Sequence, residues 1–217
     1  MKNLKLLTAA GILVIALIVF ISGYFLGRKN LSGNNLGGNS RQESSASVQT
    51  TENGAKQEEE QKPQTKIITD EFTIDLPAGW KQTPAAIGAL AMGINASEDV
   101  IDPAARRINF KSYYAVSFDT LQGKTLGEYL QTVKDELRLV ASNPLFSNEG
   151  EITINGRSAR AIEAEVFQQG TDFKVLIIAV AGEKEDVWVI TFNTTKSGWK
   201  ENKEIFSTIA NSFILKK

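Results

Sequence analysis

The chain of 217 residues contains no cysteine and no histidine. Without cysteine it can form no disulfide bond, no thiolate metal site, no thiol nucleophile and no lipidated lipoprotein anchor. Without histidine it lacks the commonest general base of enzymes and the commonest protein ligand of transition metals. These absences exclude cysteine- and histidine-dependent enzymes, and they leave only carboxylates, hydroxyls and amines for any catalysis.

An excess of positive charge is also missing. The formal net charge is −1, and from residue 66 onward there are 17 basic and 20 acidic residues. The sequence shows no basic stripe, no arginine-rich helix and no Gly-Lys-Ser/Thr phosphate loop, so it gives no support for a nucleic-acid partner or a nucleotide cofactor. We therefore expect no nucleic-acid partner and no cofactor.

The most informative segment is an uncharged run of 22 residues from Leu6 to Gly27, with lysines before it and Arg28 and Lys29 after it. As a helix it would be about 33 Å long, enough to cross a hydrocarbon core of about 30 Å. A cleaved signal peptide is the main alternative, but its apolar region is usually about 7–15 residues long. We expect a short flank (residues 1–5) and a permanent transmembrane helix (residues 6–27) that contacts the lipid bilayer.

Residues 28–65 are rich in Ser, Asn, Gly, Gln and Glu. Such a segment buries too little apolar surface to offset the entropy lost on ordering, so we expect a disordered tether between the membrane and a globular domain at residues 66–217. The charges that flank the apolar run nearly balance, which leaves the positive-inside rule undecided. The tether and the cysteine-free domain favour a single-pass protein of the cell membrane with a cytoplasmic N-terminus and an extracytoplasmic domain.

Within the domain, local signals predict alternating strands and helices. Apolar positions alternate from Phe72 to Leu76, as in a half-buried strand, and helical spacing with a Thr125–Glu128 capping box predicts a helix over residues 125–141. Asn155-Gly156 between two apolar runs predicts a β-hairpin. Further strands are expected at residues 89–94, 108–118, 157–167, 173–181 and 187–193, and a closing helix after Trp199.

The runs at residues 175–180 and 187–190 are apolar on both faces. Strands of this kind need cover on both sides of the sheet. We therefore predict an α/β (α+β) domain in which an antiparallel, meandering sheet is covered by helices on both faces, an α/β/α sandwich preceded by one transmembrane helix.

The domain resembles the PsbP-like superfamily over residues 66–215. The resemblance rests on the order of motifs: Phe72-x-Ile74-x-Leu76-Pro77-x-Gly79-Trp80, Thr125-Leu126-Gly127-Glu128-Tyr129, Ile154-Asn155-Gly156-Arg157-x-Ala159, and Val189-Ile190-Thr191-Phe192-Asn193 before Ile209-x-x-Ser212-Phe213. It implies a bacterial membrane-anchored member that acts as a non-catalytic binding or assembly module. That implication is an analogy from fold, and no metal residue is carried over because histidine is absent.

Two residue pairs are weak candidates for contact with a ligand or partner. Asp99 and Asp102, with Glu98 nearby, offer oxygen ligands for a hard cation such as Ca²⁺, although their spacing matches no EF-hand loop and an ordinary acidic loop is the alternative. Arg106 and Arg107 offer guanidinium groups to an anion, or form a solvated strand edge. We assign no catalytic, cofactor-binding or metal residue.

Glu163 and Glu165 fall on one face of a predicted strand, as a carboxylate pair for acid–base chemistry would. No partner nucleophile is evident, and we expect an ordinary exposed pair. Four aromatic residues offer a carbohydrate or peptide groove or, as we expect, ordinary packing: Trp80, Tyr113, Tyr114 and Trp199.

Together these features predict a membrane-anchored, extracytoplasmic, non-enzymatic binding or assembly module that contacts an envelope protein. One alternative is an envelope hydrolase that uses carboxylates or a Ser/Lys pair, which requires Lys111 or Lys174 beside a serine in a cleft. Another is a tethered surface or stress protein with no fixed partner.

Overall fold

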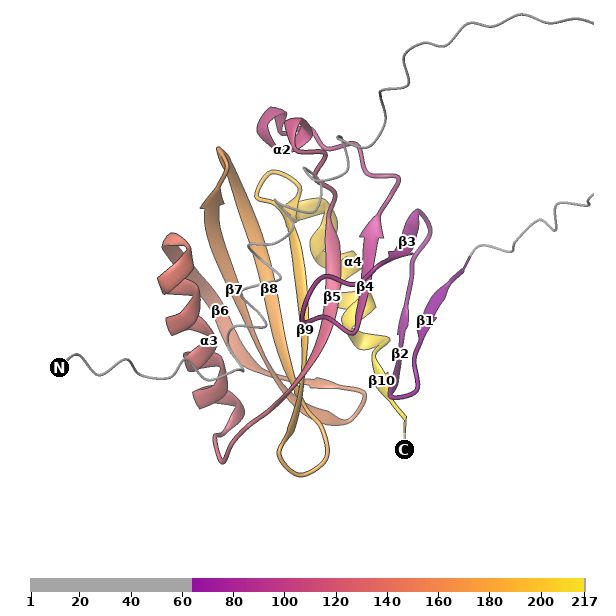
Figure 1. Ribbon diagram of the computed structural model, residues 1–217, viewed down its shortest axis with the longest axis vertical. Coiled ribbons are helices and arrows are strands. Elements are labelled where there is room, and N and C mark those ends of the chain that lie inside the picture. The colour runs from indigo at the N-terminus through magenta and orange to yellow at the C-terminus, as the bar shows by residue number, and fades with distance from the viewer. Residues whose placement is uncertain (1–63, 217) are drawn as a thin grey trace, which may run out of the picture.

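The structure, a computed structural model, describes residues 64–216 (Figure 1). The expected transmembrane helix and the tether up to residue 63 lie outside the described residues. Between residues 64 and 216, none of the helices has the length and apolarity that crossing a membrane requires.

A seven-stranded antiparallel sheet forms the centre of the domain. In spatial order its strands are β3 (Trp80–Thr83), β4 (Ala91–Asn95), β5 (Tyr113–Thr120), β9 (Asp186–Thr195), β8 (Thr171–Ala181), β7 (Arg157–Gln168) and β6 (Ser142–Ile154). A smaller sheet contains β1 (Lys66–Ile68), β2 (Phe72–Asp75) and β10 (Ile214–Leu215), with β2 in the middle. The helices are α2 (Pro103–Arg107), α3 (Leu126–Val140) and α4 (Trp199–Asn211). The α+β class and the antiparallel sheet are confirmed.

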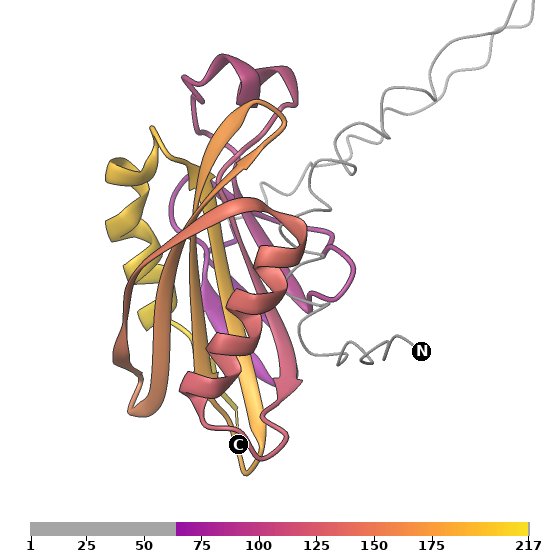
Figure 2. The same ribbon diagram turned by 90° about the vertical axis from the view of Figure 1, so that its left-hand side faces the viewer.

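Helices α3 and α4 lie on opposite faces of the large sheet (Figure 2). Along β8, Val175 and Ile177 belong to the core under α3, whereas Leu176 and Ile178 pack in the core under α4. This alternation explains why β8 and β9, which are central in the sheet, are apolar on both faces.

Two hairpins follow directly from local sequence. Asn155 and Gly156 have φ angles of 47° and 78°, and Gln169 and Gly170 have 50° and 80°. Positive φ at both central residues gives the type I′ turn that suits the right-handed twist of the strands. These turns join β6 to β7 and β7 to β8 and thereby fix the pairing register of all three strands.

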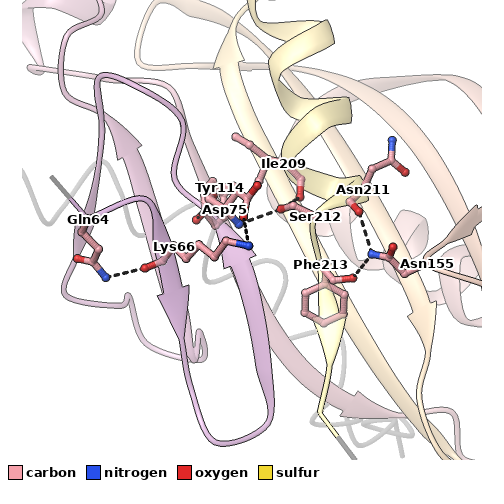
Figure 3. A network of polar contacts seen from close by, with 9 residues as sticks. All are labelled: Gln64, Lys66, Asp75, Tyr114, Asn155, Ile209, Asn211, Ser212 and Phe213. Atoms are coloured by element: carbon pink, nitrogen blue, oxygen red, sulfur yellow. Dashed lines mark hydrogen bonds and ion pairs between the residues drawn. The ribbon is translucent and has the colours of Figure 1, made fainter. Parts of the chain in front are cut away.

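Asn155 also links the first hairpin to the end of α4. Its Nδ2 donates to the carbonyl oxygens of Asn211 at 2.8 Å and Phe213 at 2.7 Å (Figure 3). Nearby, Ser212 Oγ accepts a hydrogen bond from the Asp75 amide at 2.8 Å. The C-terminal end of α4 is therefore tied both to the large sheet and to the small one.

Helix α3 begins at the predicted capping box, with Thr125 and Glu128 bonded to each other's backbone amides. Its buried residues Tyr129, Leu130, Val133 and Leu137 pack on the sheet, where α3 contacts β6, β7 and β8. Helix α4 instead lies over β9 and beside β2. The two helices are thus offset across the sheet, and this offset positions the candidate site.

Several local predictions differ from the structure. Strands β1, β3 and β10 were not expected, and β6, for which no start was predicted, begins at Ser142. The strand expected at residues 108–118 begins only at Tyr113. Residues 103–107 form α2 because Asp102 caps its first turn and Pro103 supplies a fixed φ angle that suits the start of a helix.

Candidate functional site

A groove of about 280 Å³ lies between α4 and the strands β6, β7 and β8. It exists because α4 covers β9 and leaves the neighbouring part of the sheet without a helix on this face. Its floor is apolar, with Ala161, Leu176 and Ile178 from the sheet, and Trp199 and Ala210 contribute from α4. Polar and charged lining residues are Asn148, Thr153, Glu163, Lys203, Ser207 and Asn211.

A cluster of paired charges stands at one end of this groove. The Nζ atom of Lys174 lies 3.0 Å from Glu163 Oε2 and 3.2 Å from Glu165 Oε1. The side chains of Lys174 and Glu163 are only 9% and 7% exposed, so their charges are shielded from water. The hairpin register places Lys174 directly opposite Glu165. We call Glu163, Glu165, Lys174, Lys196 and Lys203 the ion-pair cluster.

Each carboxylate of the cluster contacts a second ammonium group. Lys203 Nζ lies 3.5 Å from Glu163 Oε1, and Lys196 Nζ lies 2.7 Å from Glu165 Oε2. The Trp199 ring lies near two of these ammonium groups, with its centroid 5.5 Å from Lys174 Nζ and 5.8 Å from Lys203 Nζ. These cation–π contacts hold the indole at the edge of the groove.

The pairing determines the protonation of both carboxyl groups. Burial opposes ionisation of Glu163, but hydrogen bonds from Lys174 and Asn148 outweigh it and hold the pKa of Glu163 below its usual range. The hydrogen bond from Lys196 lowers the pKa of Glu165, and Glu165 in turn raises the pKa of Lys196. A general acid needs a raised pKa, so the lowered pKa values do not suit these two carboxylates to that role.

The expectation that Glu163 and Glu165 form an exposed pair was wrong, since Glu163 is buried and Glu165 is half-buried. Only 5% of Glu163 is accessible, because β7 faces α4 at this point and Lys174 covers the carboxylate. The predicted position of both side chains on one face is confirmed, since both carboxylates meet Lys174.

The hydrolase alternative required Lys174 or Lys111 beside a serine. Lys174 Nζ does lie 3.4 Å from Ser147 Oγ, at the long end of hydrogen-bond distances. The same Nζ atom lies closer to two carboxylates, at 3.0 and 3.2 Å, so its main contacts are ion pairs and not the serine. Lys111 donates instead to the backbone carbonyl of Glu98.

The structure separates the two predicted aspartates. Asp102 caps α2, where its Oδ1 accepts from the Ala105 amide at 2.8 Å and from Thr171 Oγ1 at 3.3 Å. Asp99 is exposed and lies with Glu98 at a different cavity, beside α4. Across residues 64–216 there is no group of three carboxylate, histidine or cysteine side chains arranged to hold a metal ion.

Arg106 and Arg107 lie in the last turn of α2 and are both exposed. They stand on a helix and not at the strand edge that the sequence predicted. They do not line the groove, so their role in binding an anion or a partner remains a prediction.

Three of the four aromatic residues that the sequence singled out are packing groups, as predicted. Trp80, Tyr113 and Tyr114 are buried, and burial raises the pKa of both tyrosines. Trp199 is half-buried and lines the groove. One signal for the groove was available in the sequence: Lys174 is a charge on the same face of β8 as the apolar residues Leu176 and Ile178.

No protein family and no curated protein matches the sequence. Among solved structures, LpqN of Mycobacterium tuberculosis, described as involved in cell envelope biogenesis, superposes with a TM-score of 0.52 at 14% identity. The match covers 73% of this chain and 88% of LpqN. Cyanobacterial PsbP from Synechocystis sp. PCC 6803 matches with a TM-score of 0.43 at 15% identity over 67% of this chain and 86% of its own. The Ran-binding protein Mog1p of Saccharomyces cerevisiae matches with a TM-score of 0.47 at 12% identity. This match covers 66% of this chain and 89% of Mog1p. The expected resemblance to the PsbP-like superfamily is confirmed, as a likeness of fold.

Proposed function

We propose that this chain is a non-enzymatic binding or assembly module that contacts an envelope protein through the groove beside α4. The groove carries the proposal: it combines an apolar floor and the accessible edge of Trp199 with charges that are already paired. Apolar pockets with a few fixed polar groups are typical of binding sites. The fold shared with LpqN supports the proposal as an analogy only, because identity is 14%.

The module is held at the cell membrane by residues 6–27, with its N-terminus in the cytoplasm and its domain outside. The length of the uncharged run and the tether that follows it support this arrangement. Protease treatment of intact cells tests the orientation. A domain that stays protected until the cells are lysed would contradict it.

Site-directed photo-crosslinking of the full-length chain in native membranes tests the function. A photoreactive residue in place of Ser207, which is exposed and lines the groove, should crosslink to one envelope protein that mass spectrometry identifies. The same residue in place of Gln131, exposed on α3, is the matched control and should give no such product.

The variant Ala161→Arg fills the groove and should abolish the Ser207 crosslink while the unfolding transition is retained. No product at Ser207, or the same product at Gln131, would contradict a partner at the groove and would favour a tethered protein with no fixed partner.

A further inference from the structure

A second cavity, of about 240 Å³, lies on the opposite side of the first turns of α4 from the groove. Three carboxylate residues, Glu98, Asp99 and Glu201, line it. Among the described residues that line it, none is lysine or arginine. The remaining lining residues are Asn95, Ser97, Val100, Ile101, Thr195, Ser197, Gly198, Asn202 and Ile205. We call this space the acidic cavity.

The carboxylate of Glu98 is held in a fixed position. Ser112 donates to it twice, from its backbone amide to Oε2 at 2.5 Å and from its Oγ to Oε1 at 2.6 Å. Ser112 is itself fully buried, and its hydroxyl also contacts Thr194 Oγ1 at 2.7 Å. Lys111 bonds to the backbone carbonyl of Glu98 and not to its carboxylate. The negative charge of Glu98 is thus rigid and has only neutral donors in these contacts.

Asn202 supplies a second observation at the same place. The residue is 3% exposed, and its Nδ2 donates to Gly198 O at 3.0 Å, to Thr194 Oγ1 at 3.3 Å and, at the long limit of 3.5 Å, to Glu98 Oε1. Its Oδ1 finds no hydrogen-bond donor within residues 64–216. A buried acceptor without a donor is costly, so a ligand that brings a donor to this cavity would relieve that cost.

These groups select the chemistry of the ligand. Fixed negative charge and an unsatisfied acceptor call for a positively charged hydrogen-bond donor. Metal binding is disfavoured because no three acidic, histidine or cysteine groups in the described part of the chain are placed to hold an ion. A primary ammonium offers three donors, and Val100, Ile101 and Ile205 give an apolar wall for an aliphatic stem.

We propose that the acidic cavity binds a lysine side chain of the protein partner. The ammonium lies between the Glu98 carboxylate and Asp99, and the stem packs on the apolar wall. Asn202 Oδ1 is shielded from solvent, so the proposal requires the amide to rotate: Nδ2 leaves Glu98 Oε1, and Oδ1 comes to face the ammonium. Glu201 contributes less, since an acidic residue in the first turn already stabilises α4. The partner is the one assumed in the proposed function, on which this inference rests.

Nuclear magnetic resonance of the full-length chain in detergent micelles, labelled with ¹⁵N-asparagine, tests the inference. The Asn202 side-chain signal is assigned by its loss in the variant Asn202→Ser. Titration with acetyl-Gly-Lys-Gly-amide, up to roughly 50 mM for a millimolar site, should shift this signal with saturation. The matched peptide with norleucine in place of lysine keeps the stem without the charge and should not shift it.

Single substitutions test whether the lysine peptide binds at the acidic cavity or is attracted to acidic groups anywhere on the surface. Glu98→Gln and Asp99→Asn should each weaken the apparent affinity about threefold, the effect expected of one half-exposed ion pair. Glu204→Gln, on the same helix but outside the cavity, should leave the affinity unchanged.

Three outcomes would overturn the inference. In the first, the Asn202 signal shows no saturable shift with the lysine peptide, and in the second it shifts equally with the norleucine peptide. In the third, CaCl₂ shifts the signal with saturation and displaces the peptide. A response to n-butylammonium chloride without one to the peptide would also reject it, since the cavity would then be closed to a lysine on a protein. All of these leave the Ser207 crosslink unaffected, so failure here is distinguishable from failure of the proposed function.

Discussion

The first turns of α4 separate two polar regions that differ in whether their carboxylates are paired with lysines. On one side, each carboxylate of the ion-pair cluster contacts two ammonium groups. On the other, the acidic cavity has three carboxylates and, among the described residues that line it, no basic one. Carboxylates that are paired within the chain fix its structure, whereas the carboxylates of the acidic cavity form no ion pair with another described residue and remain available to a ligand. The two regions should therefore respond differently to substitution.

The largest effect is expected from Lys174→Met. This variant removes the buried ammonium shared by Glu163 and Glu165, which leaves them with only the more exposed Lys196 and Lys203. Loss of one partner of a buried ion pair costs about 3 kcal/mol or more of unfolding free energy. Denaturant titration measures the loss, and Lys200→Met, on the exposed face of α4, is the control.

A loss in Lys174→Met no larger than that in Lys200→Met would show that the cluster is not structural. The triple variant Glu163→Gln/Glu165→Gln/Lys174→Met removes the unpaired charges and should recover part of the stability.

A smaller effect is expected from acid. The pKa values of Glu163 and Glu165 are lowered in the folded protein, mainly by hydrogen bonds from lysine that outweigh burial. Their stabilisation is therefore complete above the unfolded pKa of about 4.3 and is lost as the pH falls through the lower folded values. Unfolding free energies measured from pH 7 down to about pH 3 should fall more steeply for the natural chain than for Glu163→Gln/Glu165→Gln. The same dependence on pH in the natural chain and in the double variant would contradict the ion pairing of these two carboxylates.

Glu136 in α3 extends the comparison because it is a buried carboxyl group that forms no ion pair with another described residue, although the charge of Lys124 opposes the effect of burial on its pKa. Only 5% of the residue is exposed, its Oε2 finds no hydrogen-bond donor in residues 64–216, and burial raises its pKa. A raised folded pKa favours folding at low pH and costs stability once the group ionises. Glu136→Gln should raise the unfolding free energy by about 1 kcal/mol at pH 7 and by less at pH 4. A destabilised variant at pH 7 would mean that the carboxylate has a favourable partner.

The smallest effect on stability is expected from Asp99→Asn in the acidic cavity. Asp99 is exposed, and substitutions of this kind change stability by no more than about 0.5 kcal/mol. Thermal unfolding of this variant beside the natural chain measures the difference. A loss comparable to that of Lys174→Met would assign Asp99 a structural role and remove the contrast between the two regions.

Local sequence signals predicted the elements that local interactions determine. The capping box of Thr125 and Glu128 and the Asn155-Gly156 turn each act over four residues or fewer, and both are found as predicted. The start of α2 carried an equally local signal in Asp102 and Pro103, although no helix was predicted there. The turn at Gln169-Gly170 also implies that Glu165 lies opposite Lys174.

The sequence could not predict the burial of the ion-pair cluster. Whether Glu163 faces water depends on where α4 packs, and α4 begins 36 residues later in the chain. The acidic cavity likewise combines Glu98 with Asn202, which are brought together only when α4 packs beside the loop after β4. Both regions are products of tertiary packing, and neither has a contiguous motif.

The smaller sheet has a consequence for how this protein is made. Strand β10 pairs with β2, so that Leu215 lies opposite Phe72, and these two residues come from the two ends of the domain. The ribosome must therefore release the chain through Leu215 before this sheet can close. Contacts between distant parts of a chain also form late and slow folding. Until β10 pairs, the exposed edge of β2 is a target for chaperones, and removal of Ile214 and Leu215 would leave that edge open.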